Sequence, residues 1–197
     1  LQLWGFQIEA GGYSTSYIPT GSSSVTRGAD TTVIDGEEFN EFFDHRGNEK
    51  NNYSGTLLAF IEQPFESFPS TGRYNKIQLE RSNDNKVSLA TLVQSAGNPD
   101  VQGMISYGTA TQIDKTSSGS TFPTIVKHGI AYAKNSGAYT FNGNTVQTDN
   151  TMNIANSNTN THYTQLSIGA VPRKSHIKRI MYYNNRISDT QLRNLTS

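Results

Sequence analysis

The chain of 197 residues contains no cysteine. Disulfide bonds, thiolate metal sites and thiol nucleophiles are therefore excluded, and folding requires no oxidising compartment. The sequence also lacks a Gly-rich phosphate loop, a zinc-ligand spacing and a nucleophile-elbow pattern. The four histidines are isolated from one another, and we interpret each as a surface or hydrogen-bonded strand residue: His45, His128, His162 and His176.

Excess charge of either sign is also missing. Sixteen basic and sixteen acidic residues give a formal net charge of zero, and charged residues make up only 16% of the chain. Binding to nucleic acid or to an anionic membrane needs a broad positive field, so we expect neither as a partner. No apolar run approaches the ~20 residues of a membrane span, and the first residues do not resemble a signal peptide. The abrupt start at Leu1, within a strand-like pattern, suggests a fragment of a longer chain.

Hydroxyl and amide side chains supply the polarity instead. Serine, threonine and asparagine together make up about a third of the chain, well above their usual share. This composition is typical of short strands, many turns and a neutral, hydrogen-bonding surface. It fits a loop-rich extracellular β-protein and a sugar-contacting surface equally well.

Alternation of apolar and polar residues predicts an all-β protein. Ten or more short strands and few helical patterns indicate a sandwich of two packed antiparallel sheets within a single domain over residues 17–197. Residues 1–16 are predicted to be the closing strand of a preceding domain, or a linker to it. The predicted strands cover 32–34, 54–62, 74–79, 86–93, 104–109, 124–133, 139–146 (a hairpin), 165–170 and 176–183.

Several local features accompany these strands. Asp35-Gly36 is a turn signal, and Asn142-Gly143 predicts a type I′ hairpin turn because both positions tolerate positive φ. Gly129 suggests a β-bulge. Residues 113–120 are predicted to be a polar loop. Residues 37–44 carry phenylalanines among acidic residues and fit either a helical turn or a loop that inserts aromatics into the core.

The C-terminal stretch predicts a strand over 176–183, a turn at Asn184-Asn185 and a short helix. Ser188 is a good N-cap, and Gln191 three residues later completes a capping box. Ile187 and Leu192 occupy the two positions of a hydrophobic staple. Leu192 and Leu195 are expected to share one helical face.

Acidic residues offer little evidence for catalysis. A glycosidase needs two carboxylates about 5–10 Å apart across a cleft. The densest acidic patch has helical spacing and is interpreted as a solvated turn: Glu37, Glu38, Glu41 and Asp44.

Calcium is the one metal that the sequence leaves open, because it needs several hard oxygen ligands from loops. Asn98, Asp100 and Asp114 flank the predicted 104–109 strand and form one candidate set; Asp35 and Asp44 flank another loop. No regular ligand spacing is present, so we expect no obligatory cofactor, with a single calcium ion as the alternative.

Recognition of neutral sugars uses aromatic faces together with amide and hydroxyl groups. Six candidates lie in or near predicted turns: Tyr74, Tyr107, Tyr132, Tyr163, Asn142 and Asn144. Ordinary packing or turn geometry is the alternative explanation for each of them, and the hairpin alone accounts for Asn142.

Two motifs carry a family resemblance. The stretch L-W-G-F-Q-I-E-A-G-G-Y-S-T-S-Y-I-P-T-G-S-S-S-V-T-R-G-A-D at 3–30 resembles a domain junction of bacteriophage tail-fibre and virion proteins. The stretch I-K-R-I-M-Y-Y-N-N-R-I-S-D-T-Q-L-R-N-L at 177–195 resembles the closing strand and helix of their concanavalin A-like (laminin-G-like) lectin domains. The F-N-G turn at 141–143 is similar to one that occurs late in that fold.

The resemblance implies a concanavalin A-like jelly-roll β-sandwich with a short C-terminal helix. It further implies a non-catalytic module on an extracellular virion fibre, often a homotrimer, that binds a glycan or polysaccharide of the host surface. The family offers no fixed sugar-binding motif, and the acid-x-acid-x-acid strand of its glycosidases is absent here. Two alternatives stay open: a structural virion domain for trimerisation or attachment without a glycan ligand, and a glycan hydrolase or lyase.

Overall fold

The structure is a computed structural model that describes residues 32–42, 54–62, 71–82, 85–95, 98–107, 110–117, 124–152, 163–169 and 175–197. Within these ranges the chain forms eleven strands and two helices. The predicted segment 1–16 and the predicted domain start at residue 17 lie outside them. Neither described helix is long and apolar enough to span a membrane.

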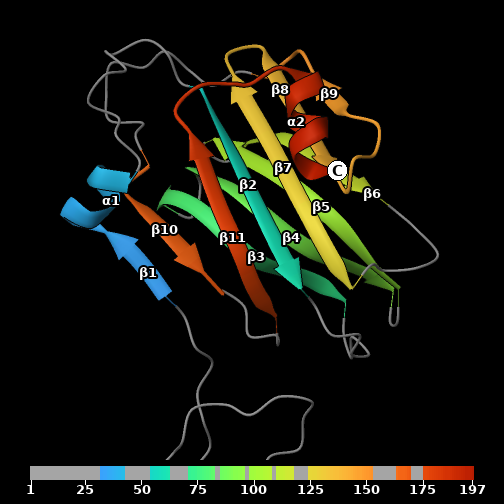
Figure 1. Ribbon diagram of the computed structural model, residues 1–197, viewed down its shortest axis with the longest axis horizontal. Helices are drawn as coiled ribbons and strands as arrows, with labels where there is room; N and C mark the ends of the chain where they lie inside the picture. The colour runs from blue at the N-terminus through green and yellow to red at the C-terminus, as the bar shows by residue number, and fades with distance from the viewer. Residues whose placement is uncertain are drawn as a thin grey trace, which may run out of the picture.

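Six strands form one antiparallel sheet in the order β1-β10-β3-β4-β5-β6 (Figure 1). The hairpin partners β3, β4, β5 and β6 follow one another in sequence, whereas β1 and β10 join from opposite ends of the chain. The bounds are β1 (Thr32–Asp35), β3 (Gly72–Ser82), β4 (Asn85–Ser95), β5 (Asn98–Tyr107), β6 (Ala110–Ser117) and β10 (Gln165–Ile168).

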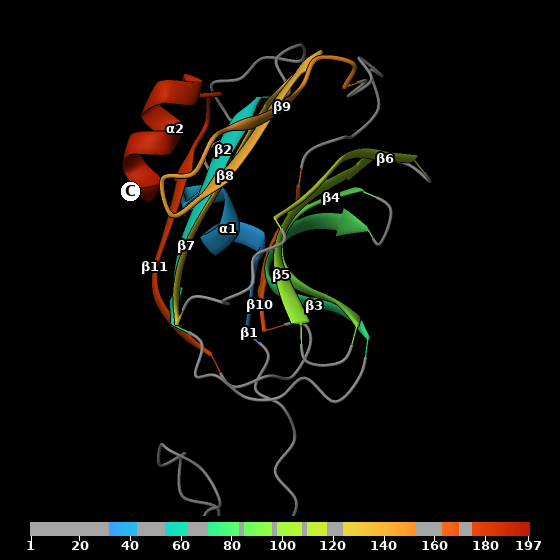
Figure 2. The same ribbon diagram turned by 90° about the vertical axis from the view of Figure 1, so that its right-hand side faces the viewer.

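Five strands form a second antiparallel sheet in the order β11-β2-β7-β8-β9. Their bounds are β2 (Gly55–Glu62), β7 (Ile125–Ala133), β8 (Ser136–Phe141), β9 (Gln147–Asp149) and β11 (His176–Tyr183). The two sheets face each other as the layers of a sandwich (Figure 2). The predicted fold class is thereby confirmed.

The main core lies between the two sheets. Side chains of a strand alternate between its two faces, so every second residue of the central strands points inward. Close packing leaves no space for a side chain at Gly103 of β5, where a Cβ would lie 2.3 Å from Cδ2 of Tyr139. Inward residues of the cluster include Leu57, Ala59, Ile61, Ile77, Leu79, Val87, Leu89, Val101, Ile105, Ile113, Ile130 and Tyr139.

The outer side of the five-stranded sheet is covered by helix α2 (Asp189–Thr196), which packs on β7 and β8 (Figures 1 and 2). A second apolar cluster fills this contact, and it includes Leu58, Ala131 and Leu192. β2 is therefore buried on both faces, which explains the apolar run Leu57-Leu58-Ala59 in its sequence.

The predicted capping box of α2 is confirmed. The Ser188 hydroxyl accepts a hydrogen bond from the Gln191 backbone N–H at 3.2 Å, and the Gln191 side chain accepts one from the Ser188 backbone N–H at 3.0 Å. Ile187 and Leu192 are both buried, as a hydrophobic staple requires. Leu195 was expected to share the helical face of Leu192, but it is exposed, because the buried side of α2 carries Leu192 and Thr196.

Gly129 provides the space for this helix. β7 is described throughout, and it pairs with β2 and β8 without a register shift, so the predicted bulge is wrong. A Cβ at Gly129 would lie 2.9 Å from Leu192 Cδ1 and 2.9 Å from Thr196 Cγ2. The glycine lets the helix approach the sheet closely.

Three other local predictions had different outcomes. Residues 113–120 were expected to be a loop, but 113–117 belong to β6, where Ile113 is buried in the core. Gly36 has a positive φ of 58° and leads directly into helix α1 (Gly36–Phe42), which buries Phe39. The turn at Asn142-Gly143 is confirmed by φ values of 45° and 69°. The strand predicted to follow it directly is not, because residues 144–146 are not a strand and the chain pairs with β8 again only in β9.

The packing of α2 yields a stability prediction with a matched control. Leu192→Ala removes a fully buried side chain and should lower the free energy of unfolding by about 2–5 kcal/mol. Leu195→Ala, three residues away and 37% exposed, should change it by less than about 0.5 kcal/mol. Urea unfolding of both variants measures the difference. Equal losses would show that α2 does not pack as described.

A buried histidine links stability to pH. His128 lies in β7, where its Nδ1 is 3.3 Å from the Tyr139 hydroxyl. Burial, with a smaller repulsion from Lys76, lowers the pKa of His128 to about 3. The unfolded chain takes up this proton near pH 6.5, so it holds more protons than the folded chain between about pH 6.5 and 3.

Stability should therefore fall as the pH drops from about 6.5 towards 3, by up to ~1.4 kcal/mol per pH unit from this residue. His128→Gln should remove this contribution, whereas His176→Gln on the edge strand β11 should leave it in place. Urea midpoints measured at several pH values test the difference. The same pH slope in wild type and His128→Gln would contradict it.

Candidate functional site

Two tyrosines predicted to stack on sugars lie in the core. Tyr132 is buried between the sheets, its hydroxyl 3.3 Å from that of Tyr182, and burial raises its pKa well above the usual range. Tyr74 is also buried. A sugar ring has no access to either face without displacing core residues. Tyr107 ends β5, and its side chain lies outside the described part of the structure.

Tyr163 precedes β10 and is half-buried. Its ring meets Tyr132 edge-on, with ring centroids 6.1 Å apart and an interplanar angle of 88°. Burial raises the pKa of Tyr163 above its ordinary value. The residue therefore has the packing role that was the alternative to sugar contact.

The two predicted asparagines serve the β8 hairpin. Asn142 Oδ1 accepts a hydrogen bond from the Lys127 N–H at 2.7 Å, and Asn142 Nδ2 donates to the Ile125 carbonyl at 3.1 Å. The Asn144 N–H donates to the Phe141 carbonyl at 2.9 Å, while its side chain is exposed. The amide of Asn142 is thus used in bracing the turn against β7.

The predicted calcium ligands do not form a described cluster. Asp114 accepts a hydrogen bond from Gln102, and Arg73 Nη2 lies 3.6 Å from Asp114 Oδ2. Asp100 is buried, which raises its pKa and disfavours the charged form that calcium needs. Asn98 begins β5 with its side chain undescribed, and no three His, Asp or Glu groups converge within the described residues.

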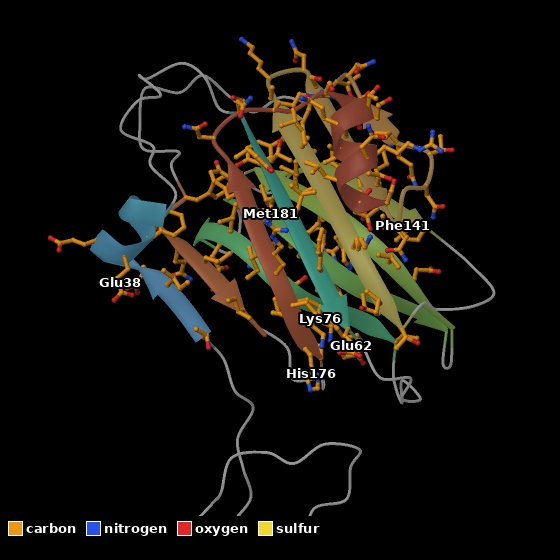
Figure 3. All side chains as sticks on the ribbon, viewed as in Figure 1. Glu38, Glu62, Lys76, Phe141, His176 and Met181 are labelled. Carbon is orange, nitrogen blue, oxygen red and sulfur yellow. The ribbon has the colours of Figure 1, made fainter. Side chains whose placement is uncertain are left out.

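The remaining charged candidates are surface residues. Glu37 and Glu38 are exposed on α1, and Glu38 points away from the sheets (Figure 3), as expected of a solvated turn. Glu62 lies 2.7 Å from Lys178 and 3.7 Å from His176 at the ends of β2 and β11 (Figure 3). Lys178 holds the pKa of the Glu62 carboxyl below its usual value. His45 and His162 lie outside the described residues.

A different surface gathers polar side chains: the outer side of the six-stranded sheet. This sheet bends away from the other one at both ends, so its outer side is concave, and no described helix or strand covers it (Figure 2). Strand alternation directs polar residues to this side and apolar ones to the core. We call it the outer polar face, made of Arg73, Asn75, Gln78, Glu80, Ser88, Gln102, Met104, Asp114, Gln165 and Ser167.

Strand register aligns these residues into rows across the sheet. One row runs through Ser167, Gln78, Ser88, Met104 and Asp114, each directly opposite the next on the neighbouring strand. Cross-strand partners have Cβ atoms about 4.5–5.5 Å apart. The row therefore forms a continuous band from β10 to β6.

One end of the face is organised by Arg73. Its Nε donates to Gln102 Oε1 at 2.6 Å, and its guanidinium also donates to the Met104 sulfur. Gln102 Nε2 in turn donates to Asp114, and the Arg73–Asp114 ion pair closes the group. These four side chains hold one another in place across β3, β5 and β6.

The other end is organised by the Glu80 carboxylate. Glu80 Oε1 accepts hydrogen bonds from Gln165 Nε2 at 2.8 Å and from the Ser167 hydroxyl at 2.5 Å. Its Oε2 accepts one from Gln78 Nε2. The amide orientation of Gln78 follows from this contact, because a carboxylate can only accept.

Three atoms between these two groups lack a partner. Asn75 Oδ1, Gln78 Oε1 and Ser88 Oγ are buried, and none makes a hydrogen bond within the described part of the chain. Gln78 is 5% exposed and Ser88 is 0% exposed, and the two lie directly opposite each other on β3 and β4. Buried polar groups normally make hydrogen bonds, so three buried polar atoms without a hydrogen bond on one face are unusual.

The sequence contained a signal for this face. Gln78 and Glu80 alternate with Ile77 and Leu79, which marks an outward polar side of that strand. The signal did not show which strands lie beside it. The predicted sugar contacts were tyrosines and asparagines in or near turns, so they did not include this face.

Comparison with protein-family models and with curated proteins finds no match. Comparison with solved structures finds several lectin-like domains. The CBM40 module of the Ruminococcus gnavus IT-sialidase, solved with α2,3-sialyllactose, matches with a TM-score of 0.53 at 14% identity, over 76% of this chain and 86% of that one. The fold is a concanavalin A-like jelly-roll β-sandwich.

Two further structures share the fold. The binding domain of botulinum neurotoxin serotype D/C matches with a TM-score of 0.55 at 11% identity, over 84% of this chain and 40% of that one. Trypanosoma rangeli sialidase, solved with the inhibitor DANA, matches with a TM-score of 0.50 at 14% identity over 73% of this chain. This chain spans only 22% of the sialidase chain. At such identities the likeness shows the fold alone.

The packing of Tyr163 changes what its substitution should do. Tyr163→Ala should lower the free energy of unfolding by about 2 kcal/mol, because the ring packs against the buried Tyr132. Tyr183→Ala, at an exposed position of β11, should cost less than about 0.5 kcal/mol. Thermal unfolding measures both. An unchanged melting temperature for Tyr163→Ala would contradict the packing role and would favour Tyr163 as a sugar-contacting residue.

Proposed function

We propose that this chain is a non-catalytic glycan-binding module and that the outer polar face is its binding surface. The observation that carries the proposal is the set of three unsatisfied polar atoms on Asn75, Gln78 and Ser88. Sugar hydroxyls donate and accept hydrogen bonds, so they supply what these atoms lack. The surrounding side chains carry amide and hydroxyl groups together with the paired charges of Arg73 and Asp114, and groups of these kinds can hydrogen-bond to a sugar.

The energetics favour a ligand at this position. An unsatisfied buried polar atom costs about 1–3 kcal/mol, and a ligand that bonds to it recovers part of that cost. The atoms are buried, with Ser88 0% and Gln78 5% exposed, so a ligand hydroxyl reaches them only when the side chains above them move. The long side chains of Arg73 and Gln78 must rotate to admit it, and rotamer changes of this kind are common on binding.

The placement of the carboxylates supports binding rather than hydrolysis. Glu80 lies on β3 and Asp114 on β6, with β4 and β5 between them. Three strand spacings of about 4.8 Å put their backbones about 14 Å apart. A glycosidase pair is about 5–10 Å apart. Both carboxylates are also engaged by neighbouring side chains of the same face.

The fold is compatible with this role, since the CBM40 module with the same fold was solved with a bound saccharide. The setting in a phage tail fibre, with a host-surface glycan as ligand and a homotrimer within a longer extracellular fibre chain, is also part of the proposal. It rests on the two sequence motifs at 3–30 and 177–195. The first motif lies outside the described residues.

A glycan array probed with the 197-residue chain tests the proposal. We expect a reproducible hit whose affinity falls at least fivefold in Asn75→Ala, since about 1 kcal/mol is the typical value of one hydrogen bond. Thr148→Ala, an exposed threonine of β9 in the other sheet, is the matched control and should bind as wild type. No hit on the array would favour a structural virion domain. Release of reducing ends from a bound glycan would favour a hydrolase.

A further inference from the structure

We infer that the outer polar face selects glycans through neutral hydroxyl groups and rejects a carboxylate as the contacting group. The inference rests on the proposed glycan-binding function and adds the chemical class of the ligand. It separates this chain from the CBM40 module of the same fold, whose ligand in that structure, α2,3-sialyllactose, carries a carboxylate.

The first support is the polarity of the unsatisfied atoms. Gln78 Nε2 donates to Glu80, so the free atom of that amide is its carbonyl oxygen Oε1. The free atom of Asn75 is likewise a carbonyl oxygen, Oδ1. Carbonyl oxygens only accept hydrogen bonds. A hydroxyl can donate to them, and an ionised carboxylate cannot.

The third unsatisfied atom fits the same ligand. The Ser88 hydroxyl lies across from Gln78 on the adjacent strand and can either donate or accept. A sugar that places neighbouring hydroxyls over this pair can donate to Gln78 Oε1 and exchange a bond with Ser88. A ligand with two adjacent hydroxyl groups therefore matches the pair of Gln78 Oε1 and Ser88 Oγ.

The second support is the distribution of charge. Arg73 is engaged by Asp114 at 3.6 Å and by Gln102 at 2.6 Å. Lys86 lies directly opposite Glu80 in the register of β3 and β4. Arg73 is therefore paired with a carboxylate, and Lys86 is the cross-strand neighbour of another, so a ligand carboxylate at either cation would lie near Asp114 or Glu80. Like charges at close range disfavour binding.

The experiment compares ligands that differ only in charge. Titration calorimetry with the 197-residue chain would use neutral oligosaccharides, oligouronides and methyl esters of the same oligouronides. We expect binding to neutral oligosaccharides, with esterification raising the affinity of an oligouronide at least tenfold. If an oligouronide bound and its methyl ester did not, the inference would be wrong, but the chain would still be a glycan-binding module. An absence of binding to every sugar, on this panel and on the glycan array, would instead refute the proposed function.

Ser88→Ala tests whether the Ser88 hydroxyl binds the ligand. Its melting temperature and its affinity for the sugar are measured together, because a purely structural role would change only the first. Removing an unsatisfied hydroxyl should leave the melting temperature unchanged or raise it, while binding to the neutral sugar weakens at least fivefold. Thr148→Ala should change neither quantity. A lower melting temperature with unchanged affinity would show that Ser88 is only structural and would overturn its assignment.

Asp114→Asn tests the role of charge. The variant removes the carboxylate that engages Arg73, so the guanidinium becomes available to an oligouronide. We expect at least threefold tighter binding of the unesterified oligouronide than wild type shows. An unchanged or weaker affinity for the oligouronide would overturn the part of the inference that assigns Asp114 to the exclusion of anions.

Discussion

The structure depends on how the two sheets bury one side of each central strand. The inward side of β2, β3, β4 and β5 is apolar because it packs across the sandwich. The outer sides then differ. α2 covers the five-stranded sheet, whose outward residues Leu58 and Ala131 are apolar. No described helix or strand covers the six-stranded sheet, whose outward residues are mostly polar, with Ala90 and Met104 among them. This asymmetry is the reason why the concave outer side is the proposed binding surface.

A β-bulge in β3 shapes that face. Asn75 pairs with Ala90 and Ile77 pairs with Leu89, so Lys76 is the additional residue between them. The bulge reverses the alternation, and it places Asn75 on the same side as Gln78 instead of in the core. Bulges often occur next to functional sites because they redirect side chains. Without this one, the two carbonyl acceptors would point to opposite sides of the sheet.

Three of the four tyrosines predicted as sugar contacts pack inside the sandwich or against its core. Tyr74 and Tyr132 fill the core, and Tyr163 packs beside them, since large rings supply much of the apolar area that a sandwich of this size must bury. In the proposed function, the outer polar face has the role that aromatic loops were expected to have. The abundance of serine, threonine and asparagine is consistent with such a surface.

Local rules in the sequence determined the all-β class, the Asn142-Gly143 turn and the Ser188 capping box, because each depends on residues close together in the chain. The strand order, the bulge at Lys76 and the covering of only one sheet were decided by tertiary structure. Glu80 and Ser167 are hydrogen-bonded although 87 residues apart, and Gln78 lies opposite Ser88 only through strand register. The alternation at 77–80 marks one polar strand side, but which strands lie beside it depends on such distant partners, so the outer polar face as a whole could not be read from the sequence.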